Sequence, residues 1–280
     1  MSRSWVLALA MAGCSFQANG VDTSGDDPLD ASGNPTDAPN SPTDAPSGPS
    51  DAFVPDGECS DPSLRLCLRF GDDLVGNTAN DGSSYGNHAA VVGLETTSRD
   101  GEGDAVKVDG DTIYIAEDPD FNLPSPMTYG AWAKLTAPFN IDEDRWRILD
   151  NNDQYSMGFY GDAEGFDARK AYCSIDGDAL ALGNLPLSDG WHHVACVVAG
   201  TKVSLFVDGL EQFDTGTFDV LNQTGQGGTC IGCNCIPGGP ALPGAENFDR
   251  LIGAVDEVKI WAKALTPLEI CTETGLVGCD

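Results

Sequence analysis

Two groups of carboxylates have the residue type needed for glycoside hydrolysis, but their spacing argues against that chemistry. A retaining glycosidase needs an acid/base carboxyl and a nucleophilic carboxylate about 5 Å apart. Asp256 and Glu257 are adjacent in a β-like run, where successive side chains point to opposite faces. Asp142, Glu143 and Asp144 lie in an apparent loop. The sequence therefore predicts no catalytic residues and a protein that is not an enzyme.

The histidines do not indicate a catalytic or metal site either. His192 and His193 are neighbours, so on a strand their side chains face opposite ways and cannot easily chelate one ion. His88 is the third and last histidine, and no Ser or Cys partner for it can be identified from the sequence. We expect the Trp191-His192-His193 run to have a structural role.

Cysteine spacing is the next chemical signal, because the chain contains ten cysteines. In an exported β-rich domain they are expected to form disulfides. Cys173 and Cys196 lie in two β-like runs that we expect to be neighbouring strands, and we predict that they pair. Cys230, Cys233 and Cys235 could instead hold zinc or an iron–sulfur cluster, but a fourth ligand is not evident nearby. Disulfides remain the favoured interpretation.

The remaining cysteines leave two questions open. Cys271 and Cys279 either close the C-terminal tail or join it to Cys59 or Cys67. If Cys14 carries a lipid, nine cysteines remain and one must be unpaired. If Cys14 carries none, all ten can pair.

The N-terminus has the features of an export signal. Arg3 precedes an apolar run over 5–12 that is too short to cross a hydrocarbon core of about 30 Å. The run 11–14, Met-Ala-Gly-Cys, resembles a bacterial lipobox, which implies a signal peptide over 1–13 and lipidation of Cys14. Ser15 then favours the outer membrane or cell surface. The alternative is ordinary cleavage after Ala12, leaving Cys14 unmodified.

Charge and composition define a linker over 14–61. Residues 15–61 contain ten Asp or Glu and no Lys or Arg, and the Pro-Thr-Asp-Ala-Pro run at 35–39 recurs at 42–46. Low hydrophobicity and like charge predict an extended, disordered segment. The whole chain carries a formal charge of −30, which argues against nucleic acid as a partner because phosphate contacts need Lys and Arg.

Residues 62–280 read as one all-β domain. Strict alternation over 64–70 and 203–207 predicts strands, as do the runs 127–135, 194–198 and 254–261. Two short runs, 106–108 and 113–115, flank Asp-Gly-Asp and predict a hairpin. One helix is expected from the capping box that begins at Thr266 with Pro267 and Glu269. The pattern predicts two stacked antiparallel sheets.

Six runs, taken in order, carry a family resemblance. Over about residues 64–272 the chain resembles the LamG/pentraxin-like group of concanavalin A-like jelly-roll domains. The matching runs are 66–70, 81–88, 103–110, 128–134, 191–209 and 248–270, the last containing Gly-Ala-Val-Asp-Glu-Val-Lys-Ile-Trp. The resemblance implies a jelly-roll sandwich that binds ligands at loops or on a concave face.

The resemblance also implies a calcium site. The family often holds one ion with the first Asp loop and with an acidic residue of a late strand. By position the ligands here are Asp81, Asn87 and Asp256. The alternative is that Asp81 and Asn87 form Asx-turns and that Asp256 is an ordinary polar residue.

Three functions follow from these observations. The leading one is a lipid-anchored surface module that binds carbohydrate or extracellular matrix, with calcium as its expected ion. The others are a structural or protein-adhesive domain, and a glycoside hydrolase. The sequence does not select a ligand site, because most aromatic residues of the region 145–166 are expected in the core. They are Trp146, Tyr155, Phe159, Tyr160 and Phe166.

Overall fold

The computed structural model describes residues 58–280 with gaps at 72, 94, 100–103, 110–111, 137–144, 153, 161–168, 177–178, 219–226, 237–238, 241–248, 277 and 279–280. The proposed signal peptide, Cys14 and nearly all of the linker lie outside the described residues, as do 142–144, Phe166 and Cys279. None of the helices in the described ranges is long and apolar enough to span a membrane.

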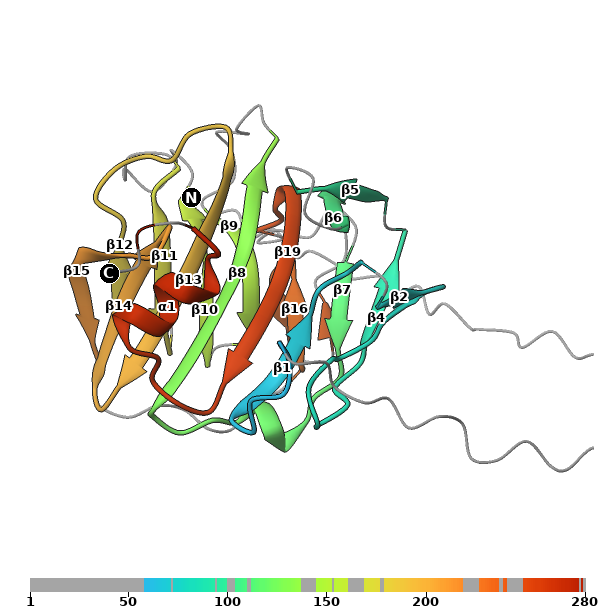
Figure 1. Ribbon diagram of the computed structural model, residues 1–280, viewed down its shortest axis with the longest axis horizontal. Helices are drawn as coiled ribbons and strands as arrows, with labels where there is room; N and C mark the ends of the chain where they lie inside the picture. Colours follow the sequence, from blue (N-terminus) through green and yellow to red (C-terminus); the bar gives the residue numbers. More distant parts are fainter. Residues whose placement is uncertain are drawn as a thin grey trace, which may run out of the picture. The chain divides into compact units, whose positions relative to one another are not determined.

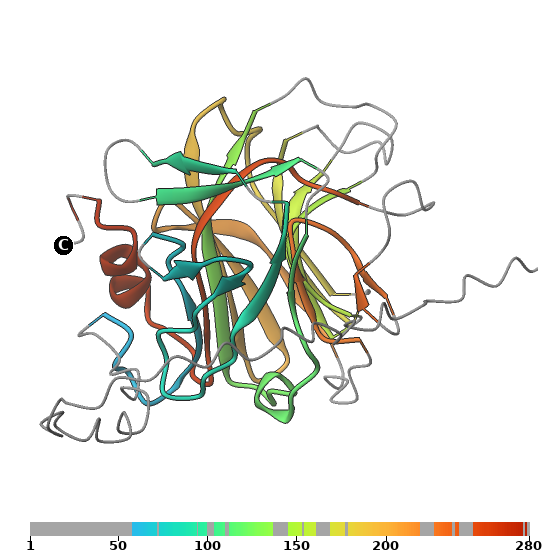
Figure 2. The same cartoon turned by 90° about the vertical axis from the view of Figure 1, so that its right-hand side faces the viewer.

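The described strands form two large antiparallel sheets packed face to face (Figures 1 and 2). We call the sheet that faces the viewer in Figure 1 the front sheet. Its described strands run in the order β15-β14-β13-β8-β19-β6-β5. Strand β1 pairs with the second half of β19, whereas β6 pairs with its first half. Their bounds are β1 (Leu64–Leu68), β5 (Thr96–Ser98), β6 (Asp104–Asp109), β8 (Met127–Leu135), β13 (Trp191–Ala199), β14 (Lys202–Val207), β15 (Leu210–Thr217) and β19 (Ile252–Trp261).

The second layer, which we call the back sheet, has the described order β12-β11-β10-β9-β16-β7-β4-β3-β2. Its bounds are β2 (Leu74–Val75), β3 (Thr78–Ala79), β4 (Ala89–Val92), β7 (Thr112–Ile115), β9 (Arg145–Asn151), β10 (Tyr155–Tyr160), β11 (Ala171–Ile175), β12 (Ala179–Leu182) and β16 (Thr229–Ile231). A short pair, β17 (Cys235–Ile236) and β18 (Gly239–Pro240), and a 3₁₀ turn, η1 (Pro119–Phe121), complete the strands and connections.

The predicted hairpin over 106–115 is wrong. Strand β6 belongs to the front sheet and pairs with β19, whereas β7 belongs to the back sheet and pairs with β16. The physical reason is burial: Val106, Val108, Ile113 and Ile115 all pack in the core between the sheets. The chain therefore crosses from one layer to the other at this point.

A second apolar cluster covers part of the outer face of the front sheet. Trp261, Ala195 and Phe206 pack there against Leu265 and Ile270. Ile270 belongs to α1 (Pro267–Glu273), which lies outside the front sheet (Figure 2). The predicted capping box is confirmed, with Thr266 as N-cap. Because the front sheet is covered on both faces, β8 and β19 are almost wholly buried.

One of the described disulfides connects the two sheets. Cys173 and Cys196 are bonded, as expected, with an S–S distance of 1.99 Å. Their strands, β11 and β13, are not neighbours in one sheet but face each other across the sandwich, so the bond joins the back sheet to the front sheet. Cysteines 59 and 67 also pair, as do 230 and 235.

The C-terminal tail is consequently not tied to Cys59 or Cys67. Cys271 is disulfide-bonded, and its partner lies outside the described residues. Cys233 is the free cysteine among the described residues, and it is buried.

The inter-sheet disulfide should contribute more stability than the local one. Its sequence separation is 23 residues, against 5 for Cys230–Cys235. Loop-closure entropy then predicts losses of about 3 and about 2 kcal/mol in the free energy of unfolding for the paired Cys→Ala variants. Urea denaturation of both double variants measures this. A smaller loss for C173A/C196A than for C230A/C235A would contradict the role assigned to the inter-sheet bond.

Candidate functional site

A β-bulge in β19 creates the polar centre of the outer face. Asp256 is paired with Trp132 of β8, but Lys259 is paired with Gly130, so β19 holds one extra residue between them. Glu257 sits in this bulge with φ +45°, a left-handed conformation that non-glycine residues seldom adopt. The bulge breaks the alternation of side chains along the strand.

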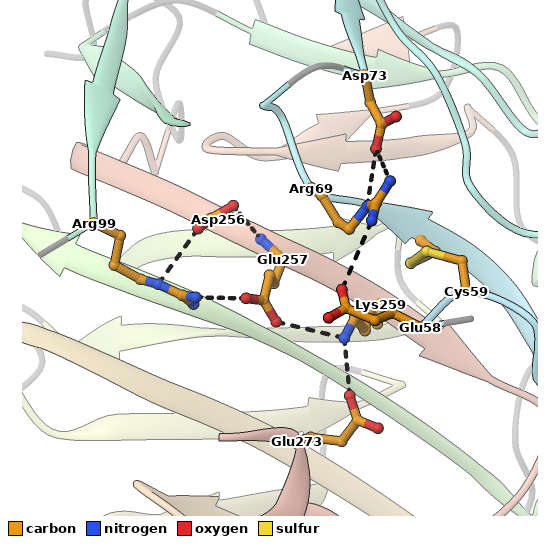
Figure 3. Close-up of polar contacts among 10 residues, drawn as sticks. Glu58, Cys59, Arg69, Asp73, Arg99, Asp256, Glu257, Lys259 and Glu273 are labelled. Carbon is orange, nitrogen blue, oxygen red and sulfur yellow. Dashed lines mark hydrogen bonds and ion pairs between the residues drawn. A yellow bond between two sulfur atoms is a disulfide. The ribbon is translucent and has the colours of Figure 1, made fainter. Parts of the chain in front are cut away.

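The expectation that Asp256 and Glu257 face opposite ways is therefore wrong. Asp256 Oδ2 lies 3.4 Å from Arg99 Nε, and Glu257 Oε1 lies 2.5 Å from Arg99 Nη2. Both carboxylates engage one guanidinium group, as Figure 3 shows. Arg99 directly follows β5, so these ion pairs join the edge strand β5 to the more central strand β19.

The charges continue as an alternating chain toward α1. Lys259 Nζ lies 3.4 Å from Glu257 Oε2 and 2.9 Å from Glu273 Oε2, at the end of the helix (Figure 3). Arg99, Asp256 and Lys259 are all less than 10% exposed. Removing one member of such a buried network leaves an uncompensated charge, which costs about 3–5 kcal/mol. This network fixes the position of Arg99.

Burial and neighbouring charges shift the pKa values of the two carboxyl groups apart. Desolvation raises the pKa of Asp256 to about 7, against the opposing effect of Arg99. For Glu257, burial also acts to raise the pKa, but Lys259 and Arg99 outweigh it and the pKa is lowered. Near neutral pH Glu257 is thus ionised, while Asp256 is present in both its protonated and its ionised form.

Arg99 also forms part of an aromatic wall. Its guanidinium carbon lies 4.7 Å from the centre of the Trp132 ring, within the range of a cation–π contact. The Trp132 ring meets the His193 ring edge-on at 5.5 Å. Trp191 begins β13, two positions before His193 on the neighbouring strand.

This wall borders a cavity of about 360 Å³, which we call the tryptophan cavity. Its described lining is Arg99, Trp132, Trp191, Asp208, Thr274, Gly275 and Leu276. A second cavity of about 280 Å³, the polar cavity, shares Arg99, Thr274 and Gly275 with the first. Its other described lining residues are Glu58, Glu257, Lys259, Thr272 and Glu273. Together the two form one cleft on the outer face of the front sheet.

Several polar atoms in this region lack a partner. Arg99 Nη1, Trp132 Nε1 and Trp191 Nε1 are buried N–H donors with no hydrogen-bond acceptor among the described residues. His193 Nδ1 is also unpartnered. Buried donors are almost always satisfied in folded proteins, so a concentration of them beside a cavity points to a bound ligand or water that supplies acceptor oxygens.

The two histidines help to build the cleft wall. Asp208, in the turn after β14, accepts a hydrogen bond from the His193 backbone N–H at 2.9 Å and lies 2.8 Å from His192 Nδ1. His192 Nε2 in turn lies 3.0 Å from Ser188 Oγ. Gly209 beside Asp208 has φ +79°, and a Cβ there would lie 3.2 Å from Cys271 Cα. A side chain at this position would be strained by the backbone angle and crowded against α1, so glycine favours the close approach of the turn to the helix.

The residues expected to bind calcium are engaged with protein partners. The buried carboxylate of Asp81 accepts four hydrogen bonds, from the backbone N–H groups of Cys67, Ser83 and Asn87 and from the Ser83 hydroxyl. Asn87 donates its side-chain amide to Arg65 O. These are the contacts of a hydrogen-bonded turn, and they leave Asp81 no lone pair for an ion.

Asp256, the third expected calcium ligand, faces a guanidinium group instead of an open coordination position. No group of three or more His, Cys, Asp or Glu side chains able to hold a metal occurs within the described ranges. The residues as placed do not fit calcium, and the resemblance alone supports it. The zinc alternative for the Cys230 region is weakened in the same way, because two of its three thiols are bonded to each other.

The sequence did not identify the cleft. Trp146, Tyr155, Phe159 and Tyr160 are buried, as expected for most of that region. The cleft aromatics are Trp132 and Trp191, which the sequence offered only as parts of strand motifs. Arg99 carried no local signal, because its carboxylate partners are more than 150 residues away. A usable signal was that two of the five tryptophans, Trp132 and Trp191, lie in runs that resemble strands of the family.

Comparison with known proteins defines the class of domain. Residues 101–271 match the family model described as the concanavalin A-like lectin/glucanases superfamily. The chain belongs to this superfamily. No curated protein matches it in a sequence search.

Solved structures share the fold at low sequence identity. The binding domain of Paraclostridial Mosquitocidal Protein 1 matches at 15% identity with a TM-score of 0.57, over 76% of this chain and 52% of that one. Domain 4 of AbnA, a GH43 extracellular arabinanase from Geobacillus stearothermophilus in complex with arabinotriose, matches at 15% and 0.55, over 75% and 97%. The binding domain of botulinum neurotoxin DC in complex with rat synaptotagmin II matches at 13% and 0.53, over 76% and 51%. The chain spans about half of the two toxin domains.

The buried histidine of the wall should make stability depend on pH. Burial lowers the pKa of His193 from 6.5 to about 4, so between these values the unfolded chain binds a proton that the folded protein does not. Stability from this group is present above pH 6.5 and is lost as the pH falls toward 4. Urea denaturation of wild type and His193→Gln from pH 7.5 to 4.5 should show wild type losing stability relative to the variant. Parallel profiles would contradict this assignment.

Proposed function

We propose that this protein is a carbohydrate-binding module and that the cleft on its front sheet is the binding site. The observation that carries the proposal is the tryptophan cavity, in which two indole rings and Arg99 meet with their N–H donors unpartnered. Sugar rings present apolar faces to aromatic side chains and hydroxyl oxygens to donors. A volume of about 360 Å³ lies in the range of small-molecule sites.

The structural neighbours support a binding role. One is a domain of an arabinanase in complex with arabinotriose, and two are named as binding domains of toxins. At these identities they establish the fold, and the ligand of this chain has to come from its own site.

Hydrolysis is not favoured by the geometry. Asp256 and Glu257 share Arg99, so a guanidinium group occupies the space between the carboxylates where a glycosidic oxygen would have to enter. Asp256 lines neither cavity of the cleft. The chain Ser188–His192–Asp208 has the atom order of a hydrolase relay, but Ser188 is exposed and also lines neither cavity. We therefore assign the domain a non-enzymatic function.

A protein ligand is the second candidate. The neighbour in complex with rat synaptotagmin II shows that a domain of this fold can hold a protein. Leu276 at the cleft rim is 45% exposed, which would suit an apolar contact. A protein ligand would leave sugar binding undetectable, so the glycan experiment separates the two.

Trp191→Ala should remove most of the carbohydrate affinity, because it deletes the partly exposed ring of the cavity. We expect a loss of about tenfold or more, equivalent to at least about 1.4 kcal/mol. The measurement is binding of residues 58–280, produced with disulfides formed, to a polysaccharide array, followed by calorimetry on the best ligand. Tyr85→Ala is the matched control, since Tyr85 is another exposed aromatic that stacks with an arginine, Arg65. Equal affinities of wild type and W191A would refute the site.

We also propose that the domain is displayed on the outer membrane or cell surface through a lipid on Cys14. The cysteine inventory supports this. If Cys14 carries a lipid, nine of the ten cysteines remain and one of them must be unpaired. Cys233 is free and buried, so it accounts for the unpaired cysteine.

Cys14→Ser tests the anchor. In cells expressing the full chain we expect wild type in the detergent-soluble membrane fraction and the variant released, because a lost acyl chain removes the membrane affinity. Cys233→Ser serves as the control and should remain membrane-bound. Release of wild type, or retention of C14S, would exclude lipidation at this residue.

A further inference from the structure

We propose that the cleft selects uncharged oligosaccharides and discriminates against acidic ones such as uronates. The inference rests on the proposed function and specifies its ligand class. Its physical basis is that Arg99, the one cation among the described lining residues of the tryptophan cavity, is already neutralised by the protein.

Arg99 is the group that would attract an acidic sugar. Two carboxylates, from Asp256 and Glu257, contact its Nε and Nη2 atoms. Even with Asp256 partly protonated, these two carboxyl groups offset the single positive charge of Arg99. What remains for a ligand is Nη1, a buried hydrogen-bond donor with no partner among the described residues. Arg99 can therefore donate to a hydroxyl or ring oxygen without offering net charge.

In the rest of the cleft, carboxylates outnumber cations among the described lining residues. Asp208 lines the tryptophan cavity, and Glu58, Glu257 and Glu273 line the polar cavity. The second cation, Lys259, is held between Glu257 and Glu273. These residues belong to a chain whose total formal charge is −30. A carboxylate entering this cleft would lose hydration and be repelled by like charge. A neutral sugar would pay a much smaller desolvation cost and would not be repelled.

The shape of the cleft adds a requirement for length. The tryptophan cavity and the polar cavity adjoin through Arg99, Thr274 and Gly275. The first offers aromatic rings and donors, and the second offers carboxylate and threonine oxygens that accept hydrogen bonds from sugar hydroxyls. One ring in each cavity is the smallest ligand that uses both sets of contacts, so affinity should rise from a monosaccharide to a di- or trisaccharide.

The experiment uses uronic-acid polysaccharides, each paired with its carboxyl-reduced neutral form, and neutral arabino-, gluco- and galacto-oligosaccharides of increasing length. We expect neutral members to bind at least about tenfold more tightly than their acidic partners, with affinity unchanged between low and high salt, since a neutral ligand is not screened. Equal or tighter binding of the acidic partner, or affinity that falls with salt, overturns the inference and leaves the proposed function intact. Binding of no member by a folded sample overturns both.

A charge variant tests the mechanism. Glu257→Gln keeps the shape of the side chain and an acceptor for Arg99, but releases part of the guanidinium charge. It should narrow the neutral-over-acidic preference at least about threefold. Asp176→Asn is the control, because it makes the same charge change at an exposed residue that directly follows β11 of the back sheet. An unchanged preference in E257Q, or an equal change in D176N, counts against the role of Arg99. If E257Q does not fold, the salt dependence of wild type still decides the question.

Discussion

The β-bulge at Glu257 is the local constraint on which the outer face of this domain depends. In a regular strand Asp256 and Glu257 would point to opposite faces, and only one of them could reach Arg99. With one extra residue in β19, both do, and Lys259 is placed to bind Glu257 and Glu273. The bulge thus converts a run of charged residues on a strand into a buried network that joins the edge of the sheet to the last helix.

That network explains why a cleft exists where it does. The outer face of the front sheet is sealed at one end by apolar contacts between Trp261, Leu265 and Ile270. Farther along, the cover becomes polar, since Lys259 and Glu273 meet there, and the segment after α1 stands over Trp132 and Trp191 without filling the space beneath it. The cleft lies where the contacts that cover the front sheet change from apolar to ionic. The interior between the sheets contains no such change, because alternating side chains of both sheets supply apolar residues to it.

The sequence predicted those features that depend on local pattern. Strand β8 and the capped helix α1 follow from a β-like run and a capping box. The pairing of Cys173 with Cys196 was predicted correctly but for the wrong reason, because their strands lie in different sheets and are not neighbours in one sheet. Features that depend on distant residues were missed. The run 106–115 crosses between sheets because both halves bury valine and isoleucine in the same core, which a turn signal cannot reveal. Arg99 lies 158 residues from Glu257, and no local sequence pattern near either residue predicts the contact. The alternation rule failed at Glu257 because its left-handed backbone is a tertiary outcome.

The assignment of the cleft as the binding site is tested most directly by a crystal structure of the domain soaked with a neutral oligosaccharide that it binds in solution. We expect density for one sugar ring between Trp132 and Trp191, with ring or hydroxyl oxygens within hydrogen-bond distance of Arg99 Nη1. A sugar found on the outer face of the back sheet, with the cleft unchanged, would contradict the assignment of the site.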